Sequence, residues 1–255
     1  MKKLLLLLPS LLLMISCTDD NNTAANEPII PEDNFIRAAD MSFLPLIESE
    51  NTVYYNADNQ PEIALTTLKN AGCNTIRIRL WKNPADAHSG FNEVKAFAQR
   101  VKQAGMKVWL TVHYSDTWAD PGNQTTPVAW QNLSFADLKT AASDYTTTIL
   151  TEIQPDIFQI GNEINSGLLW PKGHLINNES QCLELLSTIS AQIRSQSPTT
   201  KIMLHYAGIE GASWFFSKTA AIDYDYIGLS YYPIWHGTDI NLLQQTMTSL
   251  GQTHN

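Results

Sequence analysis

From residue 35 onward, short apolar runs alternate with longer segments of helical periodicity, and this alternation is the pattern of successive βα units. Strands are predicted over about 35–40, 74–80, 107–113, 156–161, 201–206 and 225–231. Strands separated by helices run parallel, and a series of such units closes into a (β/α)8 TIM barrel. The fold class expected is therefore α/β, in this barrel architecture.

The helices between these strands carry recognisable signals at their ends. The clearest helix is predicted over about 91–104, where apolar residues recur on one stripe and Gly105 stands at the position of a C-terminal cap. Another is predicted to begin at Ser134, which forms a capping box with Asp137, and to keep an apolar face as far as Ile153.

The number of units is smaller than a barrel of eight requires. Six strand and helix units are found, and the last helical pattern, from Leu242 to Leu250, is followed by no seventh or eighth strand. About a quarter of the barrel would then be missing. A complete six-stranded fold is the alternative, but an open parallel sheet exposes its edge strands, so we expect a C-terminally incomplete barrel.

The first residues predict export from the cell. A basic pair, a leucine-rich run and Ser16-Cys17 make residues 1–17 a signal peptide rather than a membrane span, because the apolar run is short. The cysteine resembles that of a bacterial lipoprotein box, so we expect lipidation of Cys17, with a plainly cleaved signal as the alternative. The attachment predicted is to the bacterial outer membrane or cell surface, through this lipid anchor only.

Two further segments complete the expected organisation. Residues 18–34 are polar and lack a periodic apolar face, which predicts a flexible acidic tether. Residues 35–255 form the expected barrel domain, for which we expect a monomer. Its two cysteines, Cys73 and Cys182, could pair, but we expect buried free thiols, because cysteine is among the most buried residue types.

Composition and short motifs exclude several classes of function. The formal charge of −9 and the lack of a Lys/Arg stripe make nucleic acid an unexpected partner. No phosphate loop, dinucleotide fingerprint or Gly-x-Ser-x-Gly elbow is present, so no cofactor is expected. The six histidines are scattered, without the spacing of a metal site, so no metal is expected either.

An apolar strand at 157–160 runs into Gly161-Asn162-Glu163. This places a carboxylic acid and a neutral amide at the mouth of the barrel, where such folds hold their active sites. A carboxylic acid there suits cleavage of a glycosidic bond, because it can protonate the leaving oxygen while the amide binds a sugar hydroxyl. The alternative is a surface glutamate that merely opens a loop.

The predicted strand at 74–80 leads to a second group of polar residues. Its alternation sends Arg77, Arg79 and Trp81 to the side opposite the apolar residues, which places two arginines inside the barrel. Because a buried guanidinium is costly unless it is paired, facing carboxylates are expected, with Asp40 and a catalytic carboxylate as the candidates. A purely structural ion-pair network is the alternative.

The segment 113–121, which follows another apolar strand, combines an imidazole, a phenol, carboxylates and an indole within nine residues. Such a mixture suits the binding of polyhydroxylated rings by hydrogen bonding and stacking. The residues predicted to bind substrate in this segment are His113, Tyr114, Asp116 and Trp118.

Four motifs, taken together and in order, resemble glycoside hydrolase family 53, the endo-β-1,4-galactanases. They are Asn74 to Trp81, His113 to Pro121, Gly161 to Asn165 with Gly167 to Pro171, and Gly228 to Pro233. The resemblance covers the chain from about residue 35 to its end. It implies a retaining barrel enzyme that cleaves β-1,4-galactan, the polysaccharide of pectic side chains. The acid/base of such an enzyme ends strand four, and its nucleophile ends strand seven.

By this resemblance, Glu163 is the catalytic acid/base, Asn162 takes the accompanying amide position, and Arg77 supports the nucleophile. Together with the residues predicted above, the complete set expected to bind substrate is Asp40, Arg79, His113, Tyr114, Asp116, Trp118, Trp170, Tyr231 and Tyr232.

The chain departs from the family pattern at the nucleophile. No Val-Glu-Thr-like strand-seven run follows Tyr232, and the earlier acids belong to other strands. Retaining hydrolysis needs two carboxyl groups about 5 to 5.5 Å apart, so we expect the chain alone to be inactive, and poorly soluble because its barrel cannot close. Two other functions stay open. One is another endo-glycanase of the same clan, such as a mannanase or cellulase, and the other is a glycan-binding lipoprotein that does not cut.

Overall fold

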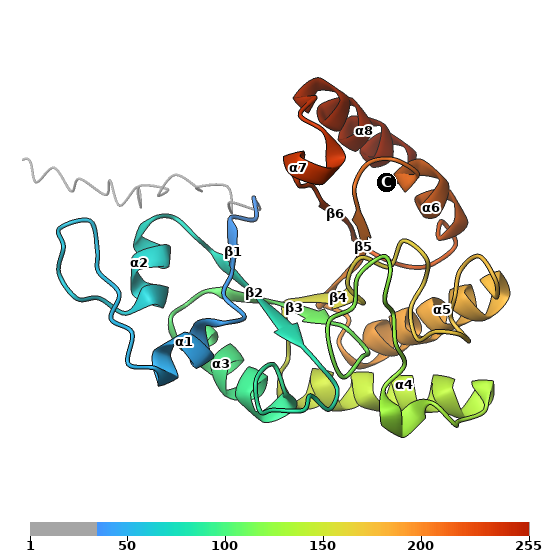
Figure 1. Cartoon of the computed structure of the whole chain (residues 1–255), viewed down its shortest axis with the longest axis horizontal. Coiled ribbons are helices and arrows are strands. Elements are labelled where there is room, and N and C mark those ends of the chain that lie inside the picture. Colours follow the sequence, from blue (N-terminus) through green and yellow to red (C-terminus); the bar gives the residue numbers. More distant parts are fainter. Residues whose placement is uncertain (1–34, 255) are drawn as a thin grey trace, which may run out of the picture. The chain divides into compact units, whose positions relative to one another are not determined.

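The computed structural model describes residues 35–254, and the account that follows concerns this part of the chain. Six parallel strands form one sheet in the order β1-β2-β3-β4-β5-β6, so that neighbours in the sequence are also neighbours in the sheet (Figure 1). All six predicted strands are present, with small differences at their ends. They are β1 (Ala38–Asp40), β2 (Thr75–Leu80), β3 (Lys107–Val112), β4 (Ile157–Ile160), β5 (Lys201–Ala207) and β6 (Tyr226–Ser230).

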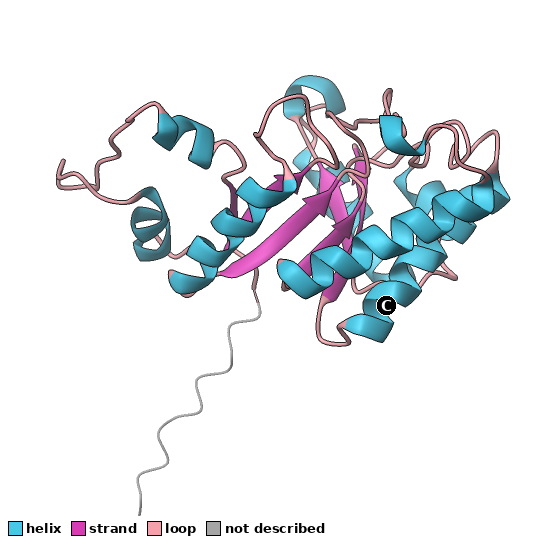
Figure 2. Ribbon diagram, turned by 90° about the horizontal axis from the view of Figure 1, so that it is seen from below, coloured by secondary structure: helices cyan, strands magenta, loops and turns pink. Residues whose placement is uncertain are grey.

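Helices lie between the strands, as expected for βα units, and Figure 2 shows them packed along the sheet. The two longest, α4 and α5, pack against each other and cover the middle of the sheet. The helical segments are α1 (Leu44–Ser49), α2 (Ala64–Asn70), α3 (Phe91–Gln103), the 3-10 turn η1 (Val128–Trp130), α4 (Phe135–Glu152), α5 (Glu179–Gln196), α6 (Ala212–Lys218), α7 (Pro233–His236) and α8 (Ile240–Thr253).

Alternation along the strands separates an apolar face of the sheet from a polar one. Ile78 of β2 is in register with Leu110 of β3, which is in register with Phe158 of β4, and each is at most 1% exposed. These residues belong to one core with the inward side chains of α3, α4 and α5. The next position along the strands carries Thr111 and Gln159, also in register, on the opposite face. The polar residues of the sheet therefore face away from the helices.

Two predicted helix boundaries are confirmed by their caps. At the start of α4, the Ser134 hydroxyl accepts the Asp137 N–H at 3.1 Å and donates to the Asp137 carboxylate at 2.7 Å. After α3, Gly105 adopts a φ of +73° and donates its N–H to the Lys102 carbonyl. This left-handed conformation is one that residues with a side chain rarely adopt, so the glycine ends the helix without strain.

The sheet has two edges. Within residues 35–254, β1 pairs with β2 alone and β6 pairs with β5 alone. The described fold is thus α/β, with six parallel strands that form a half-barrel. Beyond the β6 edge, α7 and α8 expose several large apolar side chains, namely Ile234, Trp235, Ile240, Leu242 and Met247.

The predictions made for the first residues, a signal peptide at 1–17, lipidation of Cys17 and a tether at 18–34, lie outside the described residues. In the part that is described, no helix is both long and apolar enough to cross a membrane. Cys73 and Cys182 are both free. Cys182 is buried as expected, but the same expectation is wrong for Cys73, which is half-buried because it lies in the turn between α2 and β2.

Removing the cap of α4 tests how much this predicted signal stabilises the fold. We expect Ser134→Ala to lower the free energy of unfolding by about 1 kcal/mol, because the Asp137 N–H loses its acceptor. Urea denaturation at neutral pH measures the loss. Ser134→Asn is the matched control, since asparagine is an equally good N-cap and should restore most of the stability. Equal losses in both variants would show that the cap does not contribute.

Candidate active site

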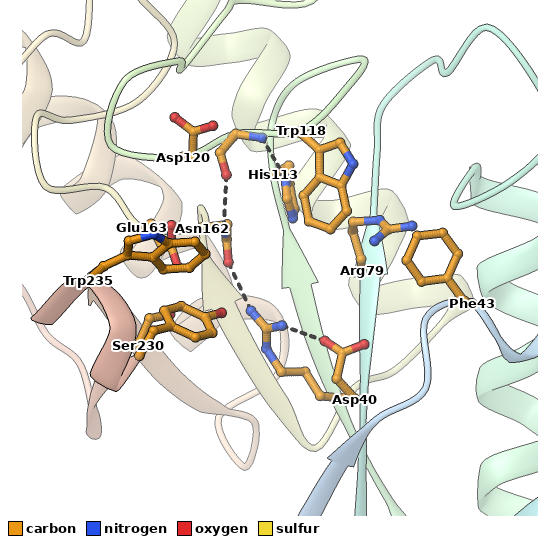
Figure 3. Close-up of a pocket in the computed structure, with 13 residues that line it drawn as sticks. Asp40, Phe43, Arg79, His113, Trp118, Asp120, Asn162, Glu163, Ser230 and Trp235 are labelled. Carbon is orange, nitrogen blue, oxygen red and sulfur yellow. Dashed lines mark hydrogen bonds and ion pairs between the residues drawn. The ribbon is translucent and has the colours of Figure 1, made fainter. Parts of the chain in front are cut away.

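The C-terminal ends of the strands surround a cavity of about 600 Å³, shown in Figure 3. Active sites of parallel (β/α) barrels occupy this face. Residues of β1, β2, β6 and α7 and of the connections that follow β1, β3 and β4 line it. They are Asp40, Phe43, Arg77, Arg79, His113, Trp118, Ala119, Asp120, Asn162, Glu163, Ser230, Tyr232 and Trp235. Of the predicted site residues, Tyr114, Asp116, Trp170 and Tyr231 are not among them.

A chain of polar contacts crosses the floor of the cavity (Figure 3). Arg77 forms an ion pair with Asp40, with Nη1 and Oδ2 at 2.5 Å, and its Nη2 donates to the Asn162 side-chain oxygen at 2.9 Å. The Asn162 amide then donates to the Ala119 carbonyl at 2.8 Å, and the Ala119 N–H donates to His113 Nδ1 at 3.0 Å. These contacts join the ends of β1, β2, β3 and β4 and fix the orientation of the asparagine amide.

Gln159, which was not predicted as a site residue, supports this series of polar contacts. Its side-chain oxygen accepts hydrogen bonds from Trp109 Nε1 at 3.1 Å and Thr111 Oγ1 at 3.2 Å, with the Arg77 guanidinium at 3.4 Å. Its amide donates to the Gly161 carbonyl at 2.7 Å. The only signal in the sequence was a glutamine within an otherwise apolar strand, and the structure shows that it is fully buried.

Glu163 lies in the turn that follows β4. Hydrogen bonds hold its backbone, whereas its side chain forms none with a described residue. Its φ is +51°, in the left-handed region, which is strained for a residue with a side chain. Its N–H donates to His205 Nδ1 at 2.9 Å, and its carbonyl accepts from the Gln124 amide at 3.2 Å. Among the described residues, no group donates a hydrogen bond to the Glu163 carboxylate or pairs with it. The carboxylate is therefore free to contact a bound molecule.

His205 of β5 is buried between this turn and β6. Because its Nδ1 accepts the Glu163 N–H, the proton of the neutral ring is on Nε2, which lies 3.1 Å from the Ser230 hydroxyl oxygen. Burial lowers the pKa of His205 to about 3, and the positive charge of Arg77 adds to the effect. A neutral His205 keeps the acceptor on which the Glu163 backbone depends.

His113 is also held neutral. Burial lowers its pKa well below the usual value, and the charges of Arg77 and Arg79 lower it further. Its Nδ1 accepts the Ala119 N–H, so the connection after β3 is fixed by an uncharged imidazole. The indole of Trp118 meets the ring edge-on, with centroids 5.9 Å apart. His113 thus lines the cavity as a neutral residue.

The expectation that Arg79 pairs with a carboxylate is wrong, because no carboxylate among the described residues forms an ion pair with it. Its guanidinium donates instead to the Ser89 hydroxyl at 2.8 to 3.0 Å. It also lies over three aromatic rings, at 4.2 Å from the centroid of Trp118, 4.5 Å from Trp81 and 4.6 Å from Phe43. Burial lowers the pKa of Arg79, and the ring faces offset part of the desolvation cost.

Tyr114 and Asp116, both predicted to bind substrate, have structural contacts instead. Tyr114 is 1% exposed, and its hydroxyl bonds to that of Thr146 at 2.6 Å within the core. The Asp116 carboxylate accepts the backbone N–H groups of Asn83 and Val128 at 3.0 and 2.8 Å, and thereby ties two loops together. Neither side chain lines the cavity.

Trp170 and Tyr231 also lie outside the cavity lining. The Trp170 indole stacks on His174 with centroids 4.7 Å apart, and its Nε1 donates to the Ser166 carbonyl at 3.0 Å. The Tyr231 hydroxyl donates to the Gly237 carbonyl at 2.5 Å. Tyr232 lines the cavity whereas these two residues do not, and the contact of all three with substrate stays a prediction.

Several lining or supporting residues were missed by sequence reasoning. Asp120 lay within the segment 113–121 but was not assigned a role. Phe43, Trp235 and His205 belonged to no motif, and nothing in the spacing around them pointed to the cavity. Tertiary contacts alone bring them there.

The buried neutral histidine gives a test by pH. Because the folded-state pKa of His205 is depressed, the unfolded chain binds a proton below about pH 6.5 that the folded chain does not. Stability should then fall by about 1.4 kcal/mol per pH unit for this group as the pH drops from 6.5 toward 3. His205→Asn removes this dependence, and its side-chain oxygen can still accept the Glu163 N–H. The difference in free energy of unfolding between the protein and this variant should change by about 2.3 kcal/mol in favour of the variant between pH 6.5 and 4.5.

Urea denaturation at the two pH values measures this difference in free energy of unfolding. Ile189→Val, at a buried site that does not titrate, is the control. Its free energy of unfolding should differ from that of the unsubstituted protein by the same amount at both pH values. If the difference in free energy of unfolding between the protein and His205→Asn also stays constant with pH, His205 is not held neutral in the folded chain.

Comparison with known proteins identifies the family. Residues 36–255 match the model of glycosyl hydrolase family 53. The chain is 34% identical over 233 residues to arabinogalactan endo-beta-1,4-galactanase A of Aspergillus niger, covering 84% of this chain and 66% of that protein. It is 34% identical over 231 residues to the endo-beta-1,4-galactanase of Bacillus subtilis, covering 82% of this chain and 52% of that protein.

The fold agrees with this match. The structure of the family 53 catalytic domain from Ignisphaera aggregans superposes with a TM-score of 0.82 at 34% identity, covering 86% of this chain and 65% of that chain. This chain thus spans about two thirds or less of the length of these relatives. The chain belongs to glycosyl hydrolase family 53.

Proposed function

We propose that the chain forms the acid/base part of the active site of an endo-acting, retaining β-1,4-galactan hydrolase, with Glu163 as general acid and base. One observation carries the proposal. The Glu163 carboxylate, which no described residue pairs with, lies just after β4 in a cavity of about 600 Å³, beside an Asn162 amide that Arg77 holds in place. The similarity to the galactanases of Aspergillus niger and Bacillus subtilis supports galactan as the substrate.

In this mechanism Glu163 acts twice. It first donates its proton to the glycosidic oxygen as the bond from that oxygen to the anomeric carbon breaks, while a second carboxylate forms a bond to the same carbon. Glu163, now ionised, then takes a proton from water, and the water oxygen displaces the second carboxylate. The products are a free sugar end and the regenerated pair of carboxyl groups.

Asn162 and Arg77 position the substrate in this proposal. The Asn162 oxygen accepts from Arg77, and one of its two amide hydrogens is donated to Ala119. The other amide hydrogen is available to a sugar hydroxyl, a contact that strengthens as positive charge develops on the sugar ring. Because the ion pair with Asp40 fixes Arg77, the amide does not need to reorient during the reaction.

Exposed aromatic residues lie at both ends of the cavity. Figure 3 shows Trp235 on one side of Asn162 and Trp118 on the other. Trp118 is 48% exposed and Trp235 is 72% exposed, so each indole offers some ring surface to the C–H face of a sugar. A cavity with aromatic surfaces on both sides of the reacting position suits binding within a polymer, which is what endo-action requires.

The nucleophile is proposed to come from outside the described part of the chain. Two other carboxylates line the cavity, Asp40 and Asp120. Asp40 is paired with Arg77 and bonded to Ser42, while Asp120 accepts the Gly122 N–H at 2.8 Å. We place the nucleophile on a strand that would follow β6, beyond Asn255. This is consistent with the greater length of the relatives, and the 255-residue chain by itself should then not hydrolyse glycan.

A second candidate function follows from the same observation, that two of the three carboxylates in the cavity already have partners. With only Glu163 unpaired in the described cavity, the chain could capture galactan without cutting it. Another endo-glycanase activity of the same clan, on mannan or glucan, is the enzymatic alternative.

Product analysis separates these functions. The full-length gene product that contains residues 36–255 should release oligosaccharides from purified β-1,4-galactan and far less from β-mannan or β-glucan. Chromatography of the soluble products measures the release. Products from mannan or glucan alone would replace galactan as the substrate, and binding of galactan without any products would favour the capture function.

Substitution of the acid/base gives the second test. In the full-length product, Glu163→Gln should lower kcat on galactan by about 10²- to 10⁴-fold, because glutamine cannot protonate the leaving oxygen. Cleavage of an aryl galacto-oligosaccharide with a dinitrophenol leaving group should be impaired much less in its first step, since that oxygen needs no protonation. Glu210→Gln, at an exposed glutamate outside the cavity, is the control with unchanged kcat. Equal losses for both substrates would argue against an acid role of Glu163.

A further inference from the structure

The main chain of Glu163 is held from two sides, by side chains to which the proposed reaction gives no role. On one side its carbonyl accepts a hydrogen bond from the Gln124 amide, at 3.2 Å. On the other side its N–H donates to His205 Nδ1 at 2.9 Å, and the next N–H, that of Ile164, donates to the His205 carbonyl at 2.9 Å. The turn after β4 is thus bonded both to the connection that follows β3 and to β5.

Gln124 belongs to the connection that follows β3 and is 1% exposed. The nitrogen of its side-chain amide donates to three main-chain carbonyls, those of Asp120 at 2.9 Å, Asn162 at 2.8 Å and Glu163 at 3.2 Å. Because all three are acceptors, the group that faces them is the NH2 end of the amide. The amide oxygen is buried and has no partner among the described residues. The side chain therefore ties two connections together although its own oxygen stays unsatisfied.

The conformation that these contacts hold is an unusual one. Glu163 has a φ of +51°, a left-handed value that a residue with a side chain keeps only when its surroundings impose it. The φ angle sets the direction of the bond from Cα to Cβ. The carboxyl group therefore enters the cavity where it does because the turn is held in this form, and a relaxed turn would redirect it.

The Asn162 side chain depends less on the same contacts. Its oxygen accepts from Arg77 at 2.9 Å, and its amide donates to the Ala119 carbonyl at 2.8 Å. The Glu163 carboxylate has no comparable contact with a described residue, so its position depends on its backbone. Loss of a backbone contact should therefore displace the carboxyl group more than the amide beside it.

We propose that Gln124 and His205 form a backbone clamp that positions the acid/base, by fixing the main chain of Glu163 so that its carboxyl group reaches the glycosidic oxygen. This inference rests on the proposed function of Glu163. Neither clamp side chain lines the cavity, so both act through Glu163 and are positioning residues. A general acid must lie within about 2.6 to 3.2 Å of the oxygen that it protonates. The clamp therefore affects the proton transfer and not the bond to the second carboxylate.

Two aryl galacto-oligosaccharides separate a displaced acid from a general disturbance of the site. In the full-length gene product, Gln124→Met keeps the length of the side chain and removes its donor. On the phenyl glycoside kcat/KM should fall by about 10²-fold, because phenol has a pKa of about 10 and its oxygen needs a proton as it leaves. On the dinitrophenyl glycoside, whose oxygen leaves without a proton, the loss should be less than about threefold.

Gln192→Met is the matched control for this substitution. The Gln192 amide donates to the Thr147 hydroxyl at 2.7 Å, in the contact between α4 and α5, and lies outside the cavity. This variant loses one side-chain hydrogen bond of a glutamine elsewhere in the fold. It should leave kcat/KM unchanged on both glycosides.

The other half of the clamp gives an independent test. His205→Leu removes the acceptor of the Glu163 N–H and should show the same selective loss on the phenyl glycoside. His205→Asn retains an acceptor oxygen and should lose much less of its kcat/KM on that substrate. A purely structural role predicts no such difference, because both variants remove the imidazole and its contact with the Ser230 hydroxyl.

The Glu163→Gln variant, measured on the same two glycosides, separates this inference from the proposed function. Selective losses in Gln124→Met and His205→Leu support the clamp. Equal losses on the two glycosides, or no loss on either, overturn it. A selective loss in Glu163→Gln alone overturns the clamp and leaves the proposed function intact. A Glu163→Gln variant without a selective loss removes the proposed function, and the clamp with it.

Discussion

The positive charge of Arg77 is the feature on which the proposed site depends. Its guanidinium links β2 to two other strands, because it pairs with Asp40 at the end of β1 and donates to the amide of Asn162, which follows β4. The same charge adds to burial in lowering the pKa of His113 and His205. A neutral imidazole can accept at Nδ1, and these two rings accept backbone N–H groups, one of them from Glu163. One fixed cation thus holds the asparagine amide and helps to keep neutral the two imidazole rings, one of which supports the turn that carries Glu163.

The contacts around Glu163 divide into a held backbone and a free side chain. The left-handed φ of this residue is unfavourable by itself, and the hydrogen bonds from Gln124 and to His205 stabilise it. These contacts leave the carboxylate itself without a hydrogen bond or ion pair to any described residue, so the side chain stays free to contact a ligand in the cavity.

Much of the fold could be predicted because its signals are local. The βα alternation indicated all six strands, and the box formed by Ser134 and Asp137 marked the start of α4. Period-two alternation in β2 also assigned Arg77 to the polar face, where it pairs with Asp40 as expected. Backbone geometry repeats every two residues in a strand and every 3.6 in a helix, so side-chain direction can be read from neighbouring residues alone.

The partners of these side chains depended on the tertiary structure. Arg79 was expected to meet a carboxylate, but the loops bring aromatic rings and Ser89 to it. Tyr114 shares its segment with His113 and yet lies in the core, where its hydroxyl bonds to that of Thr146. His205 belongs to a different strand from Glu163, and no motif links the two. The sequence by itself determined the parallel βα fold, the family motifs and the side chains that leave the apolar face. Which polar groups meet was decided only by the tertiary structure, since hydrogen bonds and ion pairs form over about 3 Å between segments far apart in the chain.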